Sequence, residues 1–289
     1  MLKRKKPSYY LYAYGLLLPS IVFFFIFAFY PFIKSVVLTF SVTDMYSKPK
    51  KWVGFQNYVR LMSKPEFWQM IRITISYAAM VGIGTFVLAM IFGMISMEQR
   101  RGSKIYQVMF ALPMAIASVP AASIFIFLLS SAGIVNKMLG ISVDWFSDPK
   151  TALVAVAMVT IWSHTGSSFL YLLVGFRNVP QELVESSLID GAGWFTRMFK
   201  ITIPIASPQI FFVVFLNILN SFKAFSFFKL LTGSGIGGST DVLIYEVYKQ
   251  AFTWNRYETS YVYATCLFLM IFIVTRIQFA VEKKVVFYQ

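Results

Sequence analysis

The chain alternates long hydrophobic runs with shorter polar segments. A helix that crosses a membrane needs about 20 predominantly apolar residues, because the hydrocarbon core is roughly 30 Å thick. The pattern therefore predicts an all-α, polytopic membrane protein with about six transmembrane helices. The six runs that meet this length are Tyr10 to Phe32, Ile71 to Met97, Ile105 to Ser130, Ala152 to Phe176, Ile203 to Leu231 and Ser260 to Val281.

Composition favours the same class of protein. Of the 289 residues, 58% are hydrophobic and only 13% are charged, which is unusual for a soluble domain. The run from Tyr10 follows a basic cluster, Lys3 to Lys6, as it would in a signal peptide. It is longer than the ~7 to 15 apolar residues of a signal peptide and has no clear cleavage site. We therefore expect it to be retained as the first span.

Prolines inside three of the predicted spans indicate kinks. Pro19, Pro120 and Pro208 lie in the first, third and fifth runs. Proline removes a backbone donor, and membrane helices accept this where neighbouring groups satisfy the freed carbonyl. Such kinks could serve as hinges or could simply shape the packing around a cavity.

The distribution of positive charge predicts the orientation in the membrane. Six spans put both termini on one side, and cytoplasmic loops carry the excess of Lys and Arg. Basic residues cluster at the N-terminus, at 100–104, at 177–200 and at Lys283 and Lys284. These segments share one side, so we expect a multi-pass protein of the bacterial cell membrane with both termini in the cytoplasm.

One external segment opposes this orientation. Its cations are Lys48, Lys50, Lys51, Arg60 and Lys64. Aromatic residues at 52, 55, 58, 67 and 68 suit a membrane interface, so an amphipathic stretch on the outer surface would tolerate these charges.

Several other classes of site find little support. The net charge of +14 could indicate nucleic acid, but the basic residues lie between apolar runs instead of lining a groove, so no nucleic-acid partner is expected. One histidine, His164, and one cysteine, Cys266, cannot form a His/Cys metal cluster. We find no set of nucleophile, base and acid, and therefore expect no catalytic residues and no enzyme activity on this chain.

The polar segment from Asn178 to Pro208 predicts two short helices outside the bilayer. A first helix should run from about Pro180 to Asp190, capped by Asn178 and ended by Gly191 in the left-handed conformation. At ~1.5 Å per residue it would reach roughly 16 Å, too short to cross the membrane. The side chains at 184, 188 and 189 fall near one face, which leaves the acidic residues free. A second helix should follow, carrying Trp194, Phe195, Met198 and Phe199.

This segment resembles the cytoplasmic "EAA" loop of permease subunits in binding-protein-dependent ABC importers. The matching residues are Glu185, Ser186, Ser187, Asp190, Gly191, Ala192, Phe199, Ile201, Pro204 and Pro208. The two serines replace the usual alanines, and Ile203 stands where leucine is common. The resemblance implies a type I importer permease fold over residues 1–289 as a single domain. It also implies that residues 178–208, here called the coupling loop, dock onto an ATPase subunit.

Weaker matches are similar to the carbohydrate branch of that family, specifically the MalF-like half of a permease pair. They include Gly54, Asn57, Tyr58, Phe67 and Trp68. This resemblance implies a second homologous permease, two cytoplasmic ATPase subunits that hold ATP and Mg²⁺, and an external solute-binding protein that delivers a carbohydrate.

No cofactor is expected on this chain: the glycine-rich stretch at 231–240 lacks the lysine of a phosphate-binding loop. An ion-coupled secondary transporter is the alternative, but it leaves the coupling loop unexplained.

Polar residues inside the spans are candidates for the substrate path, because polar groups in membrane helices normally face a cavity or another helix. Amides, hydroxyls and aromatic faces suit an uncharged sugar. The alternative is hydrogen bonding between helices, and His164 could be a proton relay or a packing residue. The candidates are Asn217, Asn220, Ser221, Phe222, Phe225, Trp162 and His164.

Overall fold

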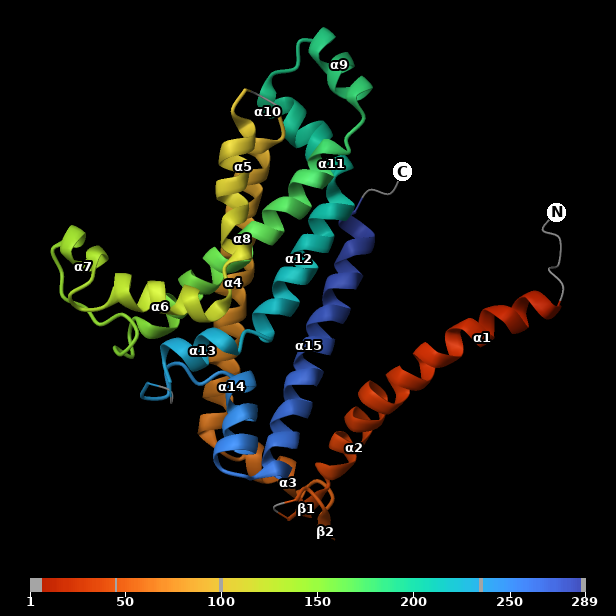
Figure 1. The fold of residues 1–289 in the computed structure, drawn as a ribbon, viewed down its shortest axis with the longest axis vertical. Coiled ribbons are helices and arrows are strands. Elements are labelled where there is room, and N and C mark those ends of the chain that lie inside the picture. Colours follow the sequence, from red (N-terminus) through yellow and green to blue (C-terminus); the bar gives the residue numbers. More distant parts are fainter. Residues whose placement is uncertain (1–6, 45, 99–100, 234–235, 287–289) are drawn as a thin grey trace. The chain divides into compact units, whose positions relative to one another are not determined.

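The computed structural model describes residues 7–44, 46–98, 101–233 and 236–286 (Figure 1). It divides the chain into two compact units, one comprising 1–64 with 247–265 and the other 65–246 with 266–289. The single permease domain over residues 1–289 stays a prediction. The basic cluster at 3–6, Arg100 and part of the glycine-rich stretch, residues 234 and 235, lie outside the described residues.

The all-α, polytopic class is confirmed. Within the described ranges, five helical segments are long and apolar enough to cross a membrane, and a bent pair of helices raises the number to six. The five segments are Tyr14–Leu38, Pro65–Ser96, Ser118–Leu139, Ala152–Arg177 and Tyr257–Val285.

The first unit begins with a helical segment and continues into a hairpin. α1 (Pro7–Phe24), the π-helix η1 (Phe25–Phe29) and α2 (Tyr30–Leu38) follow one another without a break, so the first span ends six residues later than predicted. Pro19 lies inside α1. The side chains from Leu16 to Ile33 are largely exposed, as expected for a helix that meets lipid or another protein.

A small hairpin and a short helix fill the segment that was expected to be an interfacial stretch. β1 (Ser41–Thr43) pairs antiparallel with β2 (Pro49–Trp52), and α3 (Gln56–Met62) follows. The unit is completed by the π-helix η4 (Lys249–Thr253) and by α15 (Tyr257–Val285) through Thr265.

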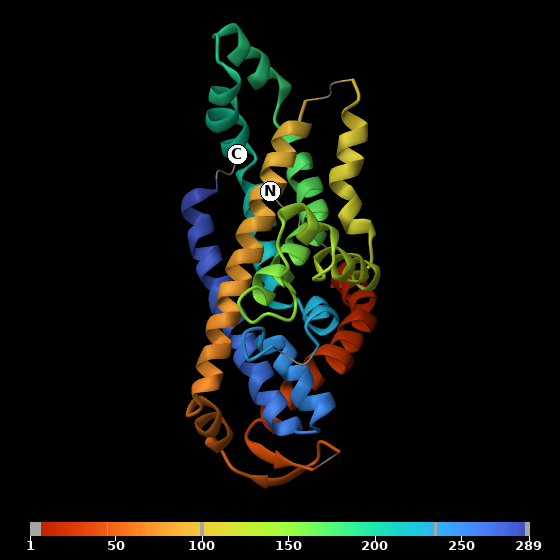
Figure 2. The same cartoon turned by 90° about the vertical axis from the view of Figure 1, so that its left-hand side faces the viewer.

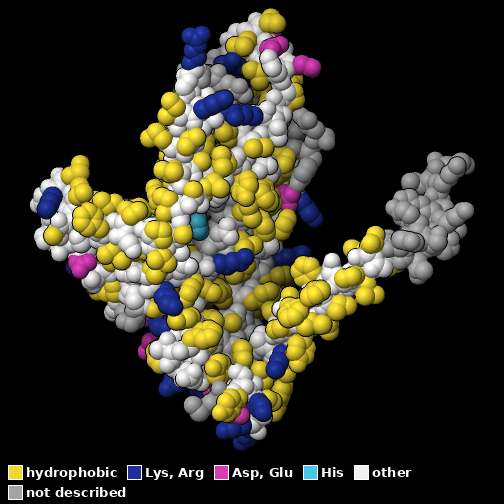
Figure 3. Space-filling model, in the orientation of Figure 1, with side chains coloured by type: hydrophobic (Ala, Val, Ile, Leu, Met, Phe, Trp, Pro, Cys, Tyr) yellow, Lys and Arg dark blue, Asp and Glu magenta, His cyan; other side chains and the backbone are white. Residues whose placement is uncertain are grey.

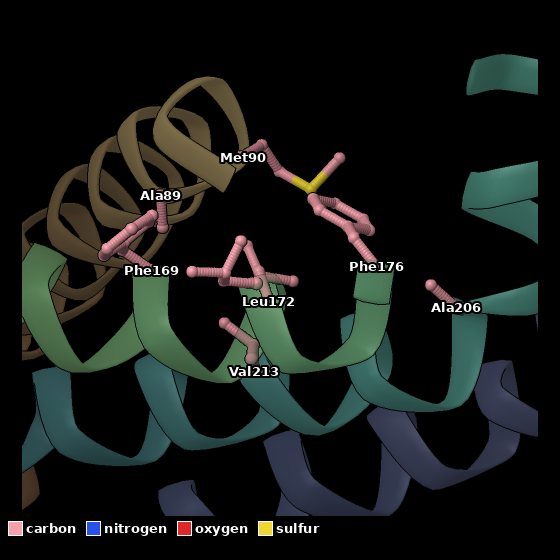
Figure 4. Packing of buried hydrophobic residues seen from close by; sticks show 8 residues of the cluster. Ala89, Met90, Phe169, Leu172, Phe176, Ala206 and Val213 are labelled. Carbon is pink, nitrogen blue, oxygen red and sulfur yellow. The ribbon is translucent and has the colours of Figure 1, made fainter. Parts of the chain in front are cut away.

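Three long helices form the centre of the second unit: α4 (Pro65–Ser96), α8 (Ala152–Arg177) and α12 (Ser207–Phe222). We call their packed contact the helix seam. Figure 2 shows the full length of α4 in orange. Close van der Waals packing stabilises this seam, because lipid tails are as apolar as the buried side chains and burial from lipid alone gives little. Its buried cluster is Ala89, Met90, Phe169, Leu172, Leu173, Phe176, Ala206 and Val213 (Figure 4).

Shorter elements connect and cover these helices. They are α5 (Ser103–Ala111), the 3-10 helix η2 (Leu112–Ala115), α6 (Ser118–Leu129), α7 (Ile134–Leu139), α9 (Gln181–Ile189), α10 (Trp194–Arg197), the π-helix η3 (Met198–Thr202), α11 (Ile203–Ile205), α13 (Ser226–Leu231) and α14 (Leu243–Tyr248).

The third and fifth predicted spans are broken, and one of the predicted kinks was wrong. The third run divides at η2, around Pro113, and not at Pro120. Pro120 lies in the first turn of α6, where a helix has no intrahelical donor to lose. The fifth run bends by 72° at Ala206, next to Pro208, which confirms that kink, and breaks again between α12 and α13.

Gly166 explains how η2 lies so close to α8. A Cβ atom at this position would lie 2.8 Å from the carbonyl oxygen of Ala111 and 3.1 Å from the backbone nitrogen of Met114. Both atoms belong to the backbone, so no side-chain rotation can relieve the clash. Only glycine therefore allows this approach.

Candidate functional site

The coupling loop begins with α9, which ends in a left-handed cap. Gly191 has φ of +76°. Its N–H donates to the Leu188 carbonyl (3.1 Å), and the Ala192 N–H donates to the Ser187 carbonyl (2.9 Å). These two bonds satisfy carbonyls that every helix leaves open at its C-terminal end. The predicted role of Gly191 in ending the helix is confirmed.

The start of α9 differs from the prediction. Asn178 does not cap this helix: it is the C-terminal cap of α8, and its N–H donates to the Val174 carbonyl (3.1 Å). Pro180 stands at the N-terminal cap of α9 with ψ of 127°, the non-helical conformation usual for a cap residue. On the first turn, the Gln181 side-chain amide donates to Glu185 (2.7 Å).

The second helix of the loop is longer than α10 alone. α10, η3 and α11 run on from Trp194 to Ile205 and then meet α12 at the 72° bend. Met198 and Thr202 are buried, whereas Pro204 is half-buried. At the bend, Ala206 belongs to the buried cluster with Phe176. The loop is thus joined directly to the helix seam.

Exposed apolar side chains distinguish the loop. Ile189 is 88% exposed, Phe195 71% and Phe199 58%. Leu188 and Ile189, which were predicted to lie near one face of the helix with residue 184, are both exposed. Glu185 and Asp190 are also exposed. In the space-filling view, basic and acidic side chains gather around α9 and α10, while hydrophobic side chains cover most of the helices below them (Figure 3). A mixed surface of this kind is typical of a protein-docking site.

The three polar candidates on α12 do not share one surface. Asn217 is 4% exposed, and its Oδ1 accepts a hydrogen bond from Ser168 Oγ of α8 (2.7 Å). Ser221 is also buried and donates to the Asn217 carbonyl (2.7 Å). Asn220 is exposed. Asn217 and Ser221 therefore lie within the helix seam, and Asn220 lies outside it.

Asn217 also carries an unsatisfied group. Its Nδ2 is buried and has no hydrogen-bond partner in the part of the chain that the structure describes. A buried amide without a partner costs about 1–3 kcal/mol.

The aromatic candidates occupy three different environments. Phe222 is buried, and Phe225 is half-buried with its ring 6.0 Å from that of Tyr245. Trp162 packs edge-on against Phe125, with ring centroids 5.1 Å apart, and borders an apolar groove of about 660 Å³. His164 is half-buried on the same helix. The structure thus does not bring the seven candidates together on one wall.

Sequence reasoning missed a contact between the ends of α4 and α8. Arg177 Nη2 donates to the Ser96 carbonyl (3.1 Å). A basic residue in the last turn of a helix is a signal for such a bond, because terminal carbonyls are open there. The contact puts the C-terminal ends of α4 and α8 side by side. The turn after Ser96 and the coupling loop therefore leave the second unit at the same end.

The described residues contain no group of three or more His, Cys, Asp or Glu side chains arranged to hold a metal ion.

Residues 85–287 match the family described as "Binding-protein-dependent transport system inner membrane component". Because the match covers more than half of the chain, the protein belongs to this family and is a permease subunit of an ABC importer. It is a multi-pass membrane protein and a transport component, not an enzyme. Family membership also decides against the ion-coupled secondary transporter.

Curated relatives cover nearly the whole chain. One is the sn-glycerol-3-phosphate transport system permease protein UgpA of Yersinia pestis bv. Antiqua (strain Antiqua), 30% identical over 279 residues, which are 94% of each chain. Another is the probable ABC transporter permease protein YesP of Bacillus subtilis (strain 168), 29% identical over 287 residues, which are 96% of this chain and 92% of YesP.

A solved structure shares the fold. It is a bacterial ABC transporter involved in the import of the acidic polysaccharide alginate, matched with a TM-score of 0.84 and 22% identity over 95% of this chain and 96% of the other. A related structure holds that transporter in complex with an alginate pentasaccharide-bound periplasmic protein, with a TM-score of 0.83, 22% identity and coverage of 95% and 94%. At this identity the likeness supports the type I importer fold alone.

Proposed function

We propose that the chain forms one half of the pore of an ATP-driven importer for a carbohydrate or carbohydrate derivative. Its partners would be a second homologous permease, two cytoplasmic ATPase subunits that hold ATP and Mg²⁺, and an external solute-binding protein. The substrate in the name of the relative UgpA, a glycerol phosphate, supports this substrate class.

The observation that carries the proposal is the surface of the coupling loop. Ile189, Phe195 and Phe199 expose large apolar side chains beside the exposed carboxylates of Glu185 and Asp190. An ATPase subunit that covers these side chains would remove them from water. Closure of the ATPase pair would then pull on α9 and, through the helix from Trp194 to Ile205, on α12. ATP in this way biases the inward-facing and outward-facing states.

The experiment is purification of the complex from a host that expresses the whole transport system. The ATPase subunits and the second permease should co-purify with the chain. The rate of ATP hydrolysis should rise when the solute-binding protein is added together with its solute. Uptake of radiolabelled solute into vesicles should require ATP inside. Uptake that follows an ion gradient and ignores ATP would overturn the proposal.

The proposed orientation puts both termini and the coupling loop in the cytoplasm. It is tested by labelling single cysteines with a membrane-impermeant reagent in a Cys266→Ala background. We expect Lys51→Cys, in the hairpin, to react from outside intact cells, and Lys104→Cys, after the first cytoplasmic turn, to react only after lysis. Both positions are exposed, so burial does not mask the result.

Asn220 is the α12 candidate that best fits a substrate path. It is exposed, whereas the Asn217 amide is engaged with α8. We infer that Asn220 and the half-buried ring of Phe225 contact the solute, and that Asn217 and Ser221 hold the wall in place. Trp162 and His164 belong to the supporting helix α8 in this scheme.

A further inference from the structure

A polar pocket of about 230 Å³ lies within the first unit of the chain. Its lining includes Arg60 in the last turn of α3, Lys64 shortly after the end of that helix, and Arg256 directly before α15. Glu258 is the single acidic residue of the lining. The pocket therefore carries three positive side chains against one negative side chain.

The wall that carries Arg60 is held by hydrogen bonds to the hairpin segment. Asn57 is buried, and its Nδ2 donates to the carbonyls of Thr39 (2.8 Å) and Ser41 (3.1 Å). The Tyr58 hydroxyl donates to Thr39 Oγ1 (2.9 Å). These bonds fix the orientation of α3, so the wall is preorganised.

The opposite wall is a tight corner between η4 and α15. Asn255 has φ of +52°, a conformation that asparagine tolerates better than most residues. The Arg256 N–H donates to the Gln250 carbonyl (2.8 Å), and Ser260 Oγ donates to the Val247 carbonyl (2.8 Å). The backbone hydrogen bond to Gln250 fixes the position of Arg256 beside the pocket.

The positive charges of the pocket are not neutralised from within. Glu258 Oε2 accepts a hydrogen bond from Thr43 Oγ1 (2.9 Å). Across the ranges that the structure describes, the side chains of Arg60, Lys64 and Arg256 form no hydrogen bond or ion pair. All three residues are exposed and line one pocket, so their positive charges are available to an anionic ligand.

The hairpin adds further positive charge. Lys48, Lys50 and Lys51 are at its turn and second strand, with Asp44 as the acidic residue. The backbone N–H groups of Lys48 and Tyr46 donate to Asp44 Oδ1 (2.8 Å each) and hold the pKa of that carboxyl below its usual range. Asp44 is thus charged and engaged by the turn, and the segment keeps a net positive charge.

The side of the membrane follows from the proposed function and its orientation, on which this inference rests. Lys64 directly precedes Pro65, where α4 begins, whereas α4 ends at Ser96 beside Arg177 and the start of the coupling loop. A pocket at the beginning of α4 then lies on the outer side. The positive-inside rule disfavours cations there, so the charges call for a functional reason.

We propose that this pocket binds the carboxylate or phosphate group of an acidic solute on the outer side of the membrane. Arginine offers a planar set of donors that fits two oxygens of such a group, and lysine adds a point charge. The volume suits a single anionic group with part of the molecule that carries it. The inference narrows the substrate class from carbohydrates in general to acidic or phosphorylated ones.

The test uses the complete importer in discs of neutral lipid and measures binding by calorimetry at low salt. Inorganic phosphate and glucuronate should each bind saturably, with glucose as the neutral comparison. Arg60→Gln and Arg256→Gln should each weaken phosphate binding by about tenfold, the scale of one charge-assisted hydrogen bond. Arg60→Lys should keep most of the affinity, and Lys50→Gln, on the exposed strand β2, should keep all of it.

Three results would overturn the proposal. The first is no anion binding by the unmodified importer. The second is an equal loss in Lys50→Gln, which would mean diffuse surface charge. The third is that pocket variants lose stimulation by the solute-binding protein while free anions do not bind, which would assign the pocket to an acidic side chain of that protein. ATP-driven uptake that persists without anion binding leaves the proposed function intact.

Discussion

The coupling loop and the contact between α8 and η2 use glycine for opposite reasons. Gly191 stands in open space, with no heavy atom within 4 Å of a Cβ built there, but its φ of +76° is unfavourable for other residues. Gly166 packs so closely on η2 that a Cβ would meet backbone atoms at 2.8 and 3.1 Å. The loop thus depends on a backbone conformation and an exposed surface, whereas the contact between α8 and η2 depends on close packing. Substitutions should therefore separate docking from folding.

The largest effect should come from Gly166→Val. The added side chain meets the Ala111 carbonyl, so the helices must move apart at a cost of about 1–3 kcal/mol or more. We expect a lower melting temperature in detergent and less protein in the membrane. Gly193→Ser is the matched control: this glycine has ordinary φ, open surroundings and the N-terminal cap position of α10, where serine is favoured. Equal stability of both variants would contradict the close packing.

The second effect concerns Asn217 and Asn220. Asn217→Leu leaves the Ser168 hydroxyl without its acceptor but also removes the unpaired Nδ2 group, so the free energy of unfolding should fall by an amount at the lower end of about 1–3 kcal/mol. Asn220→Leu changes an exposed side chain and should leave stability unchanged while lowering solute uptake. Thermal unfolding and uptake kinetics on the same preparations separate the two effects. Normal uptake by Asn220→Leu would remove this residue from the substrate path.

The third effect concerns Gly191→Val. Strain at positive φ costs about 1–3 kcal/mol, but the loop is exposed, so it can distort without unfolding the spans. We expect normal membrane insertion and melting temperature, with loss of the ATPase subunits on purification or ATP hydrolysis uncoupled from uptake. Full recovery of ATPase and full transport would show that residues 178–208 are not the coupling element.

The smallest effect should come from Glu185→Ala. The Gln181 to Glu185 hydrogen bond joins side chains four residues apart on an exposed helix and contributes about 0.2–0.5 kcal/mol. The helix should persist, and coupled ATP hydrolysis should fall by a small factor through loss of the carboxylate at the docking surface. A decrease as large as that in Gly191→Val would mean that charge matters more than loop shape.

The fold was predictable where one physical requirement dominates. The spans follow from apolar length, and the left-handed cap at Gly191 follows from the Asp190-Gly191 pair after a short helix. The break at Pro113 was missed because the effect of a proline depends on its position within the turn. The hairpin was missed because Pro49–Trp52 is short and fully exposed, with no alternation of polar and apolar residues.

The candidate site was less predictable than the fold, for a geometric reason. Asn217, Asn220 and Ser221 are close in sequence, but the direction in which each points depends on where α8 packs against α12. The sequence contains no local signal for that contact. The end of α9 was predictable from sequence because the cap at Gly191 depends on the backbone of the loop itself and on no distant contact.

The 72° bend at Ala206 sets the second helix of the loop at a steep angle to α12. The helix from Trp194 to Ile205 and the axis of α12 are close to perpendicular, so a push along the first acts mainly sideways on the end of the second. Ala206 lies in the same buried cluster as Phe176, and the Ser168 to Asn217 hydrogen bond joins α8 to α12 further along. A displacement of the loop would therefore move α8 and α12 together as one rigid body, with little sliding of one helix along the other.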